Sequence, residues 1–112
     1  MTGTAFDGDR FLNRLTEVIT ANLTNDQFGV AELAREMGMS RSYIHRHLKI
    51  LTSQSISHFI RDVRLDKAME ILKETDVSVS EVAFKVGFGS PAYFNHCFHE
   101  RFGFPPGEAW IK

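Results

Sequence analysis

The sequence predicts an all-α fold of about seven helices, with two helix-turn-helix lobes joined by a long central helix. Three observations support this fold class. Apolar residues recur with a helical period along most of the 112-residue chain, strand-like alternation is absent, and one helix–turn–helix pattern occurs twice. All three prolines stand at position 91 or later, so most of the chain is free to be helical.

The first half of the chain predicts three helices. Apolar side chains at helical spacing place the first over about residues 9–22. A short second helix covers residues 30–37, with Gly29 at its N-cap and Glu32 in its first turn. After a Gly-Met-Ser turn, Ser40 caps a third helix that runs to about residue 52.

The middle of the chain predicts the longest helix, over about residues 56–74, with Ser55 at its N-cap. Ser78 and Glu81 have the spacing of a capping box. We therefore expect a further helix to begin there and to end at Gly87.

The last part of the chain predicts one helix that carries many aromatic residues and a short final helix over 106–111. Ser90 starts the first of these, because a serine followed by proline is a typical N-cap and first helical position. Gly103 ends it. Its broad apolar face consists of Tyr93, Phe94, Cys97, Phe98 and Phe102.

An internal repeat divides the chain. The segment VAELAREMGMSRSYIHRHL (30–48) aligns with VSEVAFKVGFGSPAYFNHCF (79–98) if Gly89 is one inserted residue, and six aligned positions are then identical. Each copy is a short helix, a glycine turn and a longer helix, which is the pattern in which the second helix enters a DNA major groove. We therefore expect one domain over 1–112, with a first lobe at 9–52, a linker helix at 55–75 and a second lobe at 78–111.

The charge pattern favours a nucleic-acid partner in spite of a net charge of −1. Residues 37–61 carry four basic side chains and no acidic one, between two acidic flanks. The single cysteine excludes an internal disulfide and fits a reducing cytosol. With no apolar run near the ~20 residues of a membrane span and no secretion signal, we expect a cytoplasmic protein without membrane contact.

The sequence argues against a metal site and against catalysis. His45 and His47 point about 200° apart on a helix, whereas His96 and His99 share a face but have no second pair to complete a tetrahedral site. No nucleophile–base arrangement, phosphate-binding glycine loop or paired-carboxylate motif is present. We expect no cofactor, no metal ligand and no catalytic residue.

Three stretches resemble the DNA-binding domain of the AraC/XylS family of bacterial transcription regulators. They are ELA…GMS…YIHRHLK, FIRDVRLDKAMEIL and VSEVAFKVGFGSPAYFNHCFHERFGFPP, and the resemblance covers about residues 9–111. It implies seven helices in two homeodomain-like lobes. The first lobe is also similar to the output domain of hybrid two-component sensors. Two departures from the family pattern are Ser53, where glycine is usual, and Gly107, where serine is common.

The resemblance implies which residues read DNA bases. The implied positions on the two recognition helices are Ser42, His45, Arg46, Ala92, Asn95 and His96. Their chemistry suits the task, because Arg46 can bond guanine O6 and N7 and Asn95 can bond adenine N6 and N7. The residues expected to bind phosphate are Ser40, Arg41, Lys49, Arg61, Ser90 and His99. The second recognition helix is cationic only through Arg101 and protonated histidines, so the first lobe should carry more of the affinity.

The expected function is sequence-specific binding of double-stranded DNA, with the two recognition helices in successive major grooves. The expected further partners are RNA polymerase and a sensor or dimerisation domain outside this sequence. The alternative is a helix-turn-helix module that mainly docks on a protein, either RNA polymerase or a sister protomer. The basic groove faces argue against that alternative, because a docking face would carry exposed leucine or aromatic residues.

Overall fold

The structure is a computed structural model that describes residues 6–111. Within this range it has six α-helices, one 3₁₀ helix and no strand, which confirms the predicted all-α fold. The final helix is the 3₁₀ helix, a tighter form that is used in short pieces. The elements are α1 (Gly8–Ala21), α2 (Val30–Met37), α3 (Arg41–Thr52), α4 (Ile56–Glu74), α5 (Val79–Lys85), α6 (Pro91–Phe102) and η1 (Pro106–Ile111).

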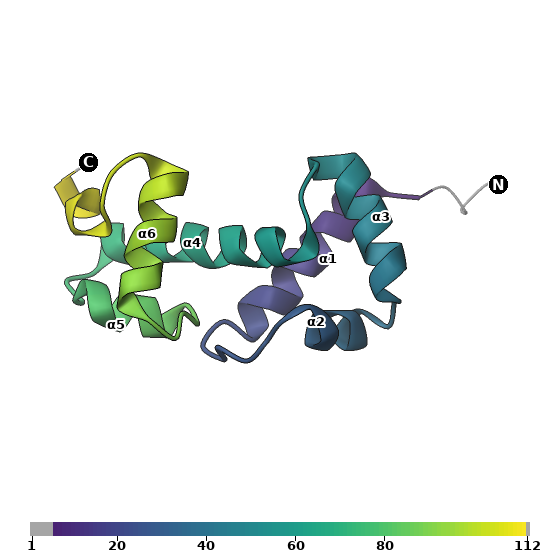
Figure 1. Ribbon diagram of the computed structural model, residues 1–112, viewed down its shortest axis with the longest axis horizontal. Helices are drawn as coiled ribbons and strands as arrows, with labels where there is room; N and C mark the ends of the chain where they lie inside the picture. Colours follow the sequence, from purple (N-terminus) through teal and green to yellow (C-terminus); the bar gives the residue numbers. More distant parts are fainter. Residues whose placement is uncertain (1–5, 112) are drawn as a thin grey trace.

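The molecule is elongated, with α4 along its long axis (Figure 1). Its extents are 50 × 27 × 21 Å. Helices α1, α2 and α3 gather at one end of α4 and form lobe 1, whereas α5, α6 and η1 gather at the other end and form lobe 2 (Figure 1). The two lobes are therefore separated along the chain and in space.

Side-chain caps begin the helices where the sequence predicted them. The hydroxyls that accept a hydrogen bond from the backbone N–H three residues on belong to Ser40, Ser55, Ser78 and Ser90. At α5, the carboxylate of Glu81 accepts in return from the backbone N–H of Ser78, which completes the predicted capping box. At α2, Glu32 Oε1 accepts from the Gly29 N–H at 3.0 Å, and this bond lowers the pKa of Glu32.

Each lobe has its own hydrophobic core. The core of lobe 1 is mainly aliphatic, and Ile44 and Leu48 of α3 are fully buried in it. The core of lobe 2 is rich in aromatic rings, with Phe94 and Phe98 of α6 fully buried and their centroids 5.7 Å apart. Cys97 is buried in the same core, as its place on the apolar face predicted. Helix α4 contributes to both cores.

The two recognition helices end in the same backbone conformation with different residues. Ser53 follows α3 with φ 65°, and Gly103 follows α6 with φ 84°. Among the described residues, Ser53 is the only residue other than glycine with a positive φ. A left-handed serine costs about 1 kcal/mol relative to glycine, so this departure from the family pattern has an energetic consequence.

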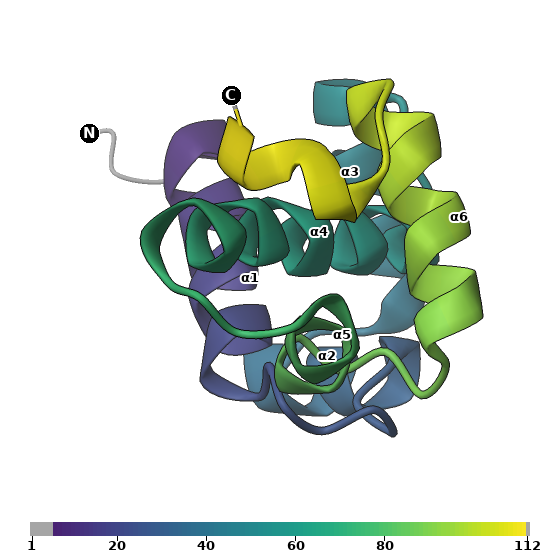
Figure 2. The ribbon, with the colours of Figure 1, turned by 90° about the vertical axis from the view of Figure 1, so that its left-hand side faces the viewer.

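Helices α3 and α6 run in the same direction, each rising from the end of α2 or α5 (Figure 1). Both lie on the side of α4 that faces away from α1 (Figure 2). The longer helices of the two repeat copies are thus parallel and lie on one face of the molecule.

Candidate nucleic-acid interface

The predicted base-reading residues of α3 lie together on its exposed side. Ser42, His45 and Arg46 are all exposed, because the opposite side of the helix packs into the core of lobe 1. The three side chains line one hollow together with Arg41 and the first residues of α4. They can therefore act on one ligand at the same time.

The exposed side of α3 is positively charged. Arg41, Arg46 and Lys49 are exposed, and among the described residues none of them has an acidic partner within 4.0 Å. The guanidinium carbon of Arg46 lies 6.0 Å from the centroid of the Tyr43 ring, a separation at which the cation and the ring attract. The charge of α3 is thus available to an anion.

The predicted base-reading residues of α6 are also exposed, but two of them have partners within their own helix. Ala92, Asn95 and His96 face solvent. Asn95 Nδ2 donates to the carbonyl oxygen of Pro91 at 3.0 Å, and His96 Nε2 lies 3.5 Å from a carboxylate oxygen of Glu100. A DNA base that bonds these two side chains must replace those contacts.

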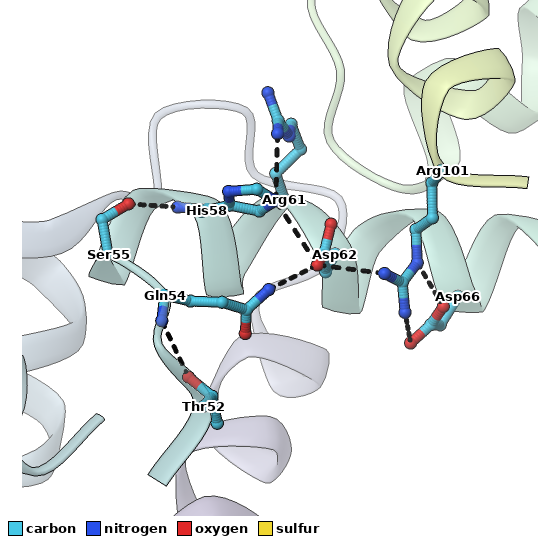
Figure 3. A network of polar contacts seen from close by, with 8 residues as sticks. All are labelled: Thr52, Gln54, Ser55, His58, Arg61, Asp62, Asp66 and Arg101. Carbon is cyan, nitrogen blue, oxygen red and sulfur yellow. Dashed lines mark hydrogen bonds and ion pairs between the residues drawn. The ribbon is translucent and has the colours of Figure 1, made fainter. Parts of the chain in front are cut away.

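The only arginine of α6 is held by α4 (Figure 3). Arg101 Nε and Nη2 donate to the two carboxylate oxygens of Asp66 at 2.9 and 3.1 Å, and Nη1 lies 3.0 Å from Asp62 Oδ2. The hydrogen bonds that Arg101 donates to Asp66 and the charges of both aspartates raise the pKa of Arg101. Arg101 is therefore neutralised within the protein and adds no free positive charge to α6.

The predicted phosphate-binding residues lie in three environments: at helix caps, on exposed helix surfaces and, for Arg61, in a hollow between the lobes. The hydroxyls of Ser40 and Ser90 cap their helices, accepting from Tyr43 N at 3.1 Å and from Tyr93 N at 3.3 Å. The N–H groups that remain without an intrahelical partner are the donors an anion needs. They belong to Arg41 and Ser42 in α3 but to Ala92 alone in α6, because Pro91 has no N–H. Lys49 and His99 are exposed on the last turns of their helices.

Arg61 lies apart from the others, in a hollow between the lobes. Its side chain is half-buried, with Nη2 3.2 Å from His58 Nε2, and its Nε is buried without a hydrogen-bond partner. A hydrogen bond with Tyr93 and the charge of Asp62 raise the pKa of Arg61, so it stays charged. The hollow also contains Ser57. Arg61 can thus reach an anion that approaches α4 between the two recognition helices.

Two interlobe contacts were not predicted from the sequence. Asp62 of α4 accepts from Gln54 Nε2 at 2.6 Å in addition to its contact with Arg101 (Figure 3). Arg64, two residues on, is 5% exposed and bonds to backbone carbonyls of both lobes. The available signal was an arginine between two apolar residues of the central helix, Val63 and Leu65.

Among residues 6–111, no helix is long and apolar enough to cross a membrane. Within the same part of the chain, no three histidine, cysteine or acidic side chains gather as a metal ion would require.

Comparisons with known proteins agree with this architecture. The family model described as Helix-turn-helix domain matches residues 33–109. Histidine kinase P4 of Formosa agariphila is 30% identical over 89% of this chain and 7% of that protein, and the HTH-type transcriptional regulator CdhR of Pseudomonas aeruginosa is 35% identical over 69% and 23%. The DNA-binding domain of AdpA, solved in complex with a target DNA, superposes with a TM-score of 0.77 at 29% identity, covering 89% of each chain.

Two parallel helix-turn-helix units on one face define a tandem helix-turn-helix protein. The chain belongs to the AraC/XylS family of helix-turn-helix transcription regulators. It spans 7% of the kinase, 23% of CdhR and 26% of the regulator GbdR of Pseudomonas aeruginosa.

Proposed function

We propose that this chain binds double-stranded DNA in a sequence-specific manner, as the output domain of a bacterial transcription regulator. One observation carries the proposal: α3 and α6 run parallel on one face, and each buries an apolar side in its own core. The exposed surface of the two helices is mainly polar, with Ile50, Leu51 and Tyr93 as exceptions. The AdpA domain, which was solved with its target DNA, has this same fold. Regulation of transcription places the chain in the cytoplasm.

The two helices enter successive major grooves, about 10 bp apart. On α3, Arg46 bonds guanine, His45 and Ser42 contact neighbouring base edges, and Arg41 and Lys49 bind the flanking phosphates. On α6, Asn95 bonds adenine, with His96 and Ala92 beside it. The N-terminal turns behind Ser40 and Ser90, together with Arg61 and His99, complete the phosphate contacts.

The two reading faces differ, so the binding site is asymmetric. Arg46 occupies the place in α3 that His96 occupies in α6, and His45 corresponds to Asn95. One chain therefore binds a non-palindromic element, and a dimer binds a pair of such elements.

The activity of the whole regulator rests on partners outside this chain. The kinase, CdhR and GbdR each contain more than three times as many residues as this sequence matches in them. A sensor or dimerisation domain supplies the signal, and the match to a histidine kinase supports a two-component system as its source. RNA polymerase is the partner through which transcription changes. This chain itself has no enzymatic role.

Selection from a pool of random duplexes tests the proposal. Bound DNA is sequenced at two salt concentrations, for wild type, for Arg46→Ala and for Arg14→Ala, an exposed arginine of α1 that serves as the matched control. We expect a bipartite motif with halves about 10 bp apart, which loses one half in Arg46→Ala and is unchanged in Arg14→Ala. An absence of DNA binding at low salt would contradict the proposal and favour protein docking.

A further inference from the structure

Arg64 stands at the boundary between the two cores. Val63 before it belongs to the core of lobe 1, and Leu65 after it belongs to the core of lobe 2. Its side chain is buried among backbone atoms, and this burial lowers the pKa of Arg64 from its ordinary value. A buried charge requires compensating bonds, and Arg64 obtains them from backbone carbonyls.

The guanidinium of Arg64 donates four hydrogen bonds, three to lobe 1 and one to lobe 2. Nη1 donates to the carbonyl oxygen of Leu23 at 2.6 Å and to that of Val86 at 2.8 Å. Nη2 donates to Asn25 at 3.0 Å and to Phe28 at 3.1 Å. The first, third and fourth carbonyls lie between α1 and α2, whereas Val86 follows α5 directly. One side chain thus ties both lobes to the middle of α4.

Gly87 makes the close approach possible. Its φ is +83°, and a Cβ added there would overlap Arg64 Nη1 and lie 2.5 Å from the carbonyl oxygen of Leu23. Any side chain at this position therefore displaces the guanidinium. Gly103 has nearly the same φ, +84°, but a Cβ there meets nothing within 4 Å.

Few other contacts hold the lobes in register. In lobe 1 the helices pack on one another and on α4, in lobe 2 they do the same, and the substantial packing between the lobes passes through α4. The second polar tie is Asp62, which accepts from Gln54 beside α3 and from Arg101 of α6 (Figure 3). Arg64 is the tie that reaches the loops of both lobes directly.

We propose that Arg64 is a positioning residue that fixes the separation of α3 and α6, and thereby sets the spacing between the two DNA sub-sites that this chain accepts. The inference rests on the proposed DNA binding, but Arg64 itself touches no DNA. Two binding units that are held rigidly at the correct separation gain affinity from their connection, about 100-fold or more. Units that are held loosely lose part of this gain and accept other spacings.

The matched variants are Arg64→Lys, Gly87→Ala and Gly103→Ala. Lysine keeps the charge but cannot make the four fixed bonds of a guanidinium. Gly87→Ala displaces Arg64, whereas Gly103→Ala introduces the same backbone strain without touching it. Circular dichroism and thermal unfolding establish that each variant is folded, and Gly87→Ala carries the test if Arg64→Lys does not fold.

The first measurement needs no DNA. Spin labels at Glu36→Cys in α2 and Lys85→Cys in α5, both exposed, report the interlobe distance in a Cys97→Ala background. We expect a narrow distance distribution in wild type and Gly103→Ala, and a broader one in Arg64→Lys and Gly87→Ala. An unchanged distribution in folded Arg64→Lys and Gly87→Ala would overturn the inference.

The second measurement uses duplexes with the selected sub-sites at their natural spacing and with one or two base pairs inserted or removed. In Arg64→Lys and Gly87→Ala we expect affinity at the natural spacing to fall about tenfold, a smaller penalty for altered spacing, and unchanged affinity for one sub-site alone. Retention of the wild-type spacing preference would overturn the inference. Wild type without any sequence preference would instead overturn the proposed function, while the distance measurement would still decide the mechanical role of Arg64.

Discussion

Helix α3 of lobe 1 presents Arg41, Arg46 and Lys49 to solvent, whereas α6 of lobe 2 has one arginine, which Asp62 and Asp66 hold. The two helices share their length, their serine cap and their left-handed C-terminal residue. The two copies of the repeat therefore share their backbone conformation but differ in the charge of their exposed side chains. We therefore expect lobe 1 to contribute more of the electrostatic attraction to DNA than lobe 2.

The hydrophobic cores of the two lobes differ as well, in their share of aromatic rings. Truncation of a core residue should lower the free energy of unfolding more than any surface substitution. Phe98→Ala removes a fully buried ring from lobe 2 and should lower the free energy of unfolding by about 3–5 kcal/mol, whereas Leu48→Ala in lobe 1 should cost about 2–5 kcal/mol. Urea unfolding, followed by circular dichroism, measures both. A cost below about 1 kcal/mol for Phe98→Ala would contradict its place in the core.

The charge difference between the recognition helices predicts unequal losses of DNA affinity. Arg46→Ala should cost about 1–3 kcal/mol of binding free energy, because it removes a bidentate base contact and a positive charge. His96→Ala should cost less and should leave the salt dependence nearly unchanged. Fluorescence anisotropy at several salt concentrations measures both, with Arg14→Ala as the control. Equal losses at every salt concentration would remove the distinction between the lobes.

Substitution of the residues that follow the two recognition helices, Ser53 and Gly103, should change the stability in opposite directions. Ser53→Gly should stabilise the protein by about 0.5–1 kcal/mol, because glycine adopts the left-handed conformation without strain. Gly103→Ala should destabilise it by about 1 kcal/mol for the reverse reason. Thermal unfolding of the two variants tests the pair, and a destabilised Ser53→Gly would contradict the account.

Much of the fold could be predicted from the sequence, because its signals are local. Helix starts at Ser40, Ser55, Ser78 and Ser90 depend on a bond to a backbone N–H three residues away, and all four are present in the structure. The periodicity of α6 placed Phe94, Cys97 and Phe98 in the core, where they lie. It placed Tyr93 on the same face, but Tyr93 is 52% exposed. Ser53 stands where the family usually has glycine, and its φ of 65° is the conformation that glycine favours.

The sequence predicted which positions form the candidate site, but it did not predict which contacts their side chains make within the protein. Exposure of Ser42, His45 and Arg46 follows from helical periodicity. The contact between Asn95 and Pro91 within α6 spans four residues, but the choice of that rotamer depends on the surroundings of the side chain. The half-buried position of Arg61 was not predicted, because the hollow around it is also lined by Asp26 and Tyr93, which are distant in sequence.

The sequence by itself determined the helices, their caps and the chemistry of each exposed face, because these depend on residues within about one helical turn of each other. The repeat is a property of the sequence itself. The tertiary structure alone decided which charges are free. Arg64 bonds to Leu23 and Val86, which are 41 and 22 residues away, and Arg101 bonds to Asp66, which is 35 residues away. Such partners meet only when the lobes have packed on α4, so no local pattern records that these two arginines hold the protein together while Arg41 and Arg46 remain available.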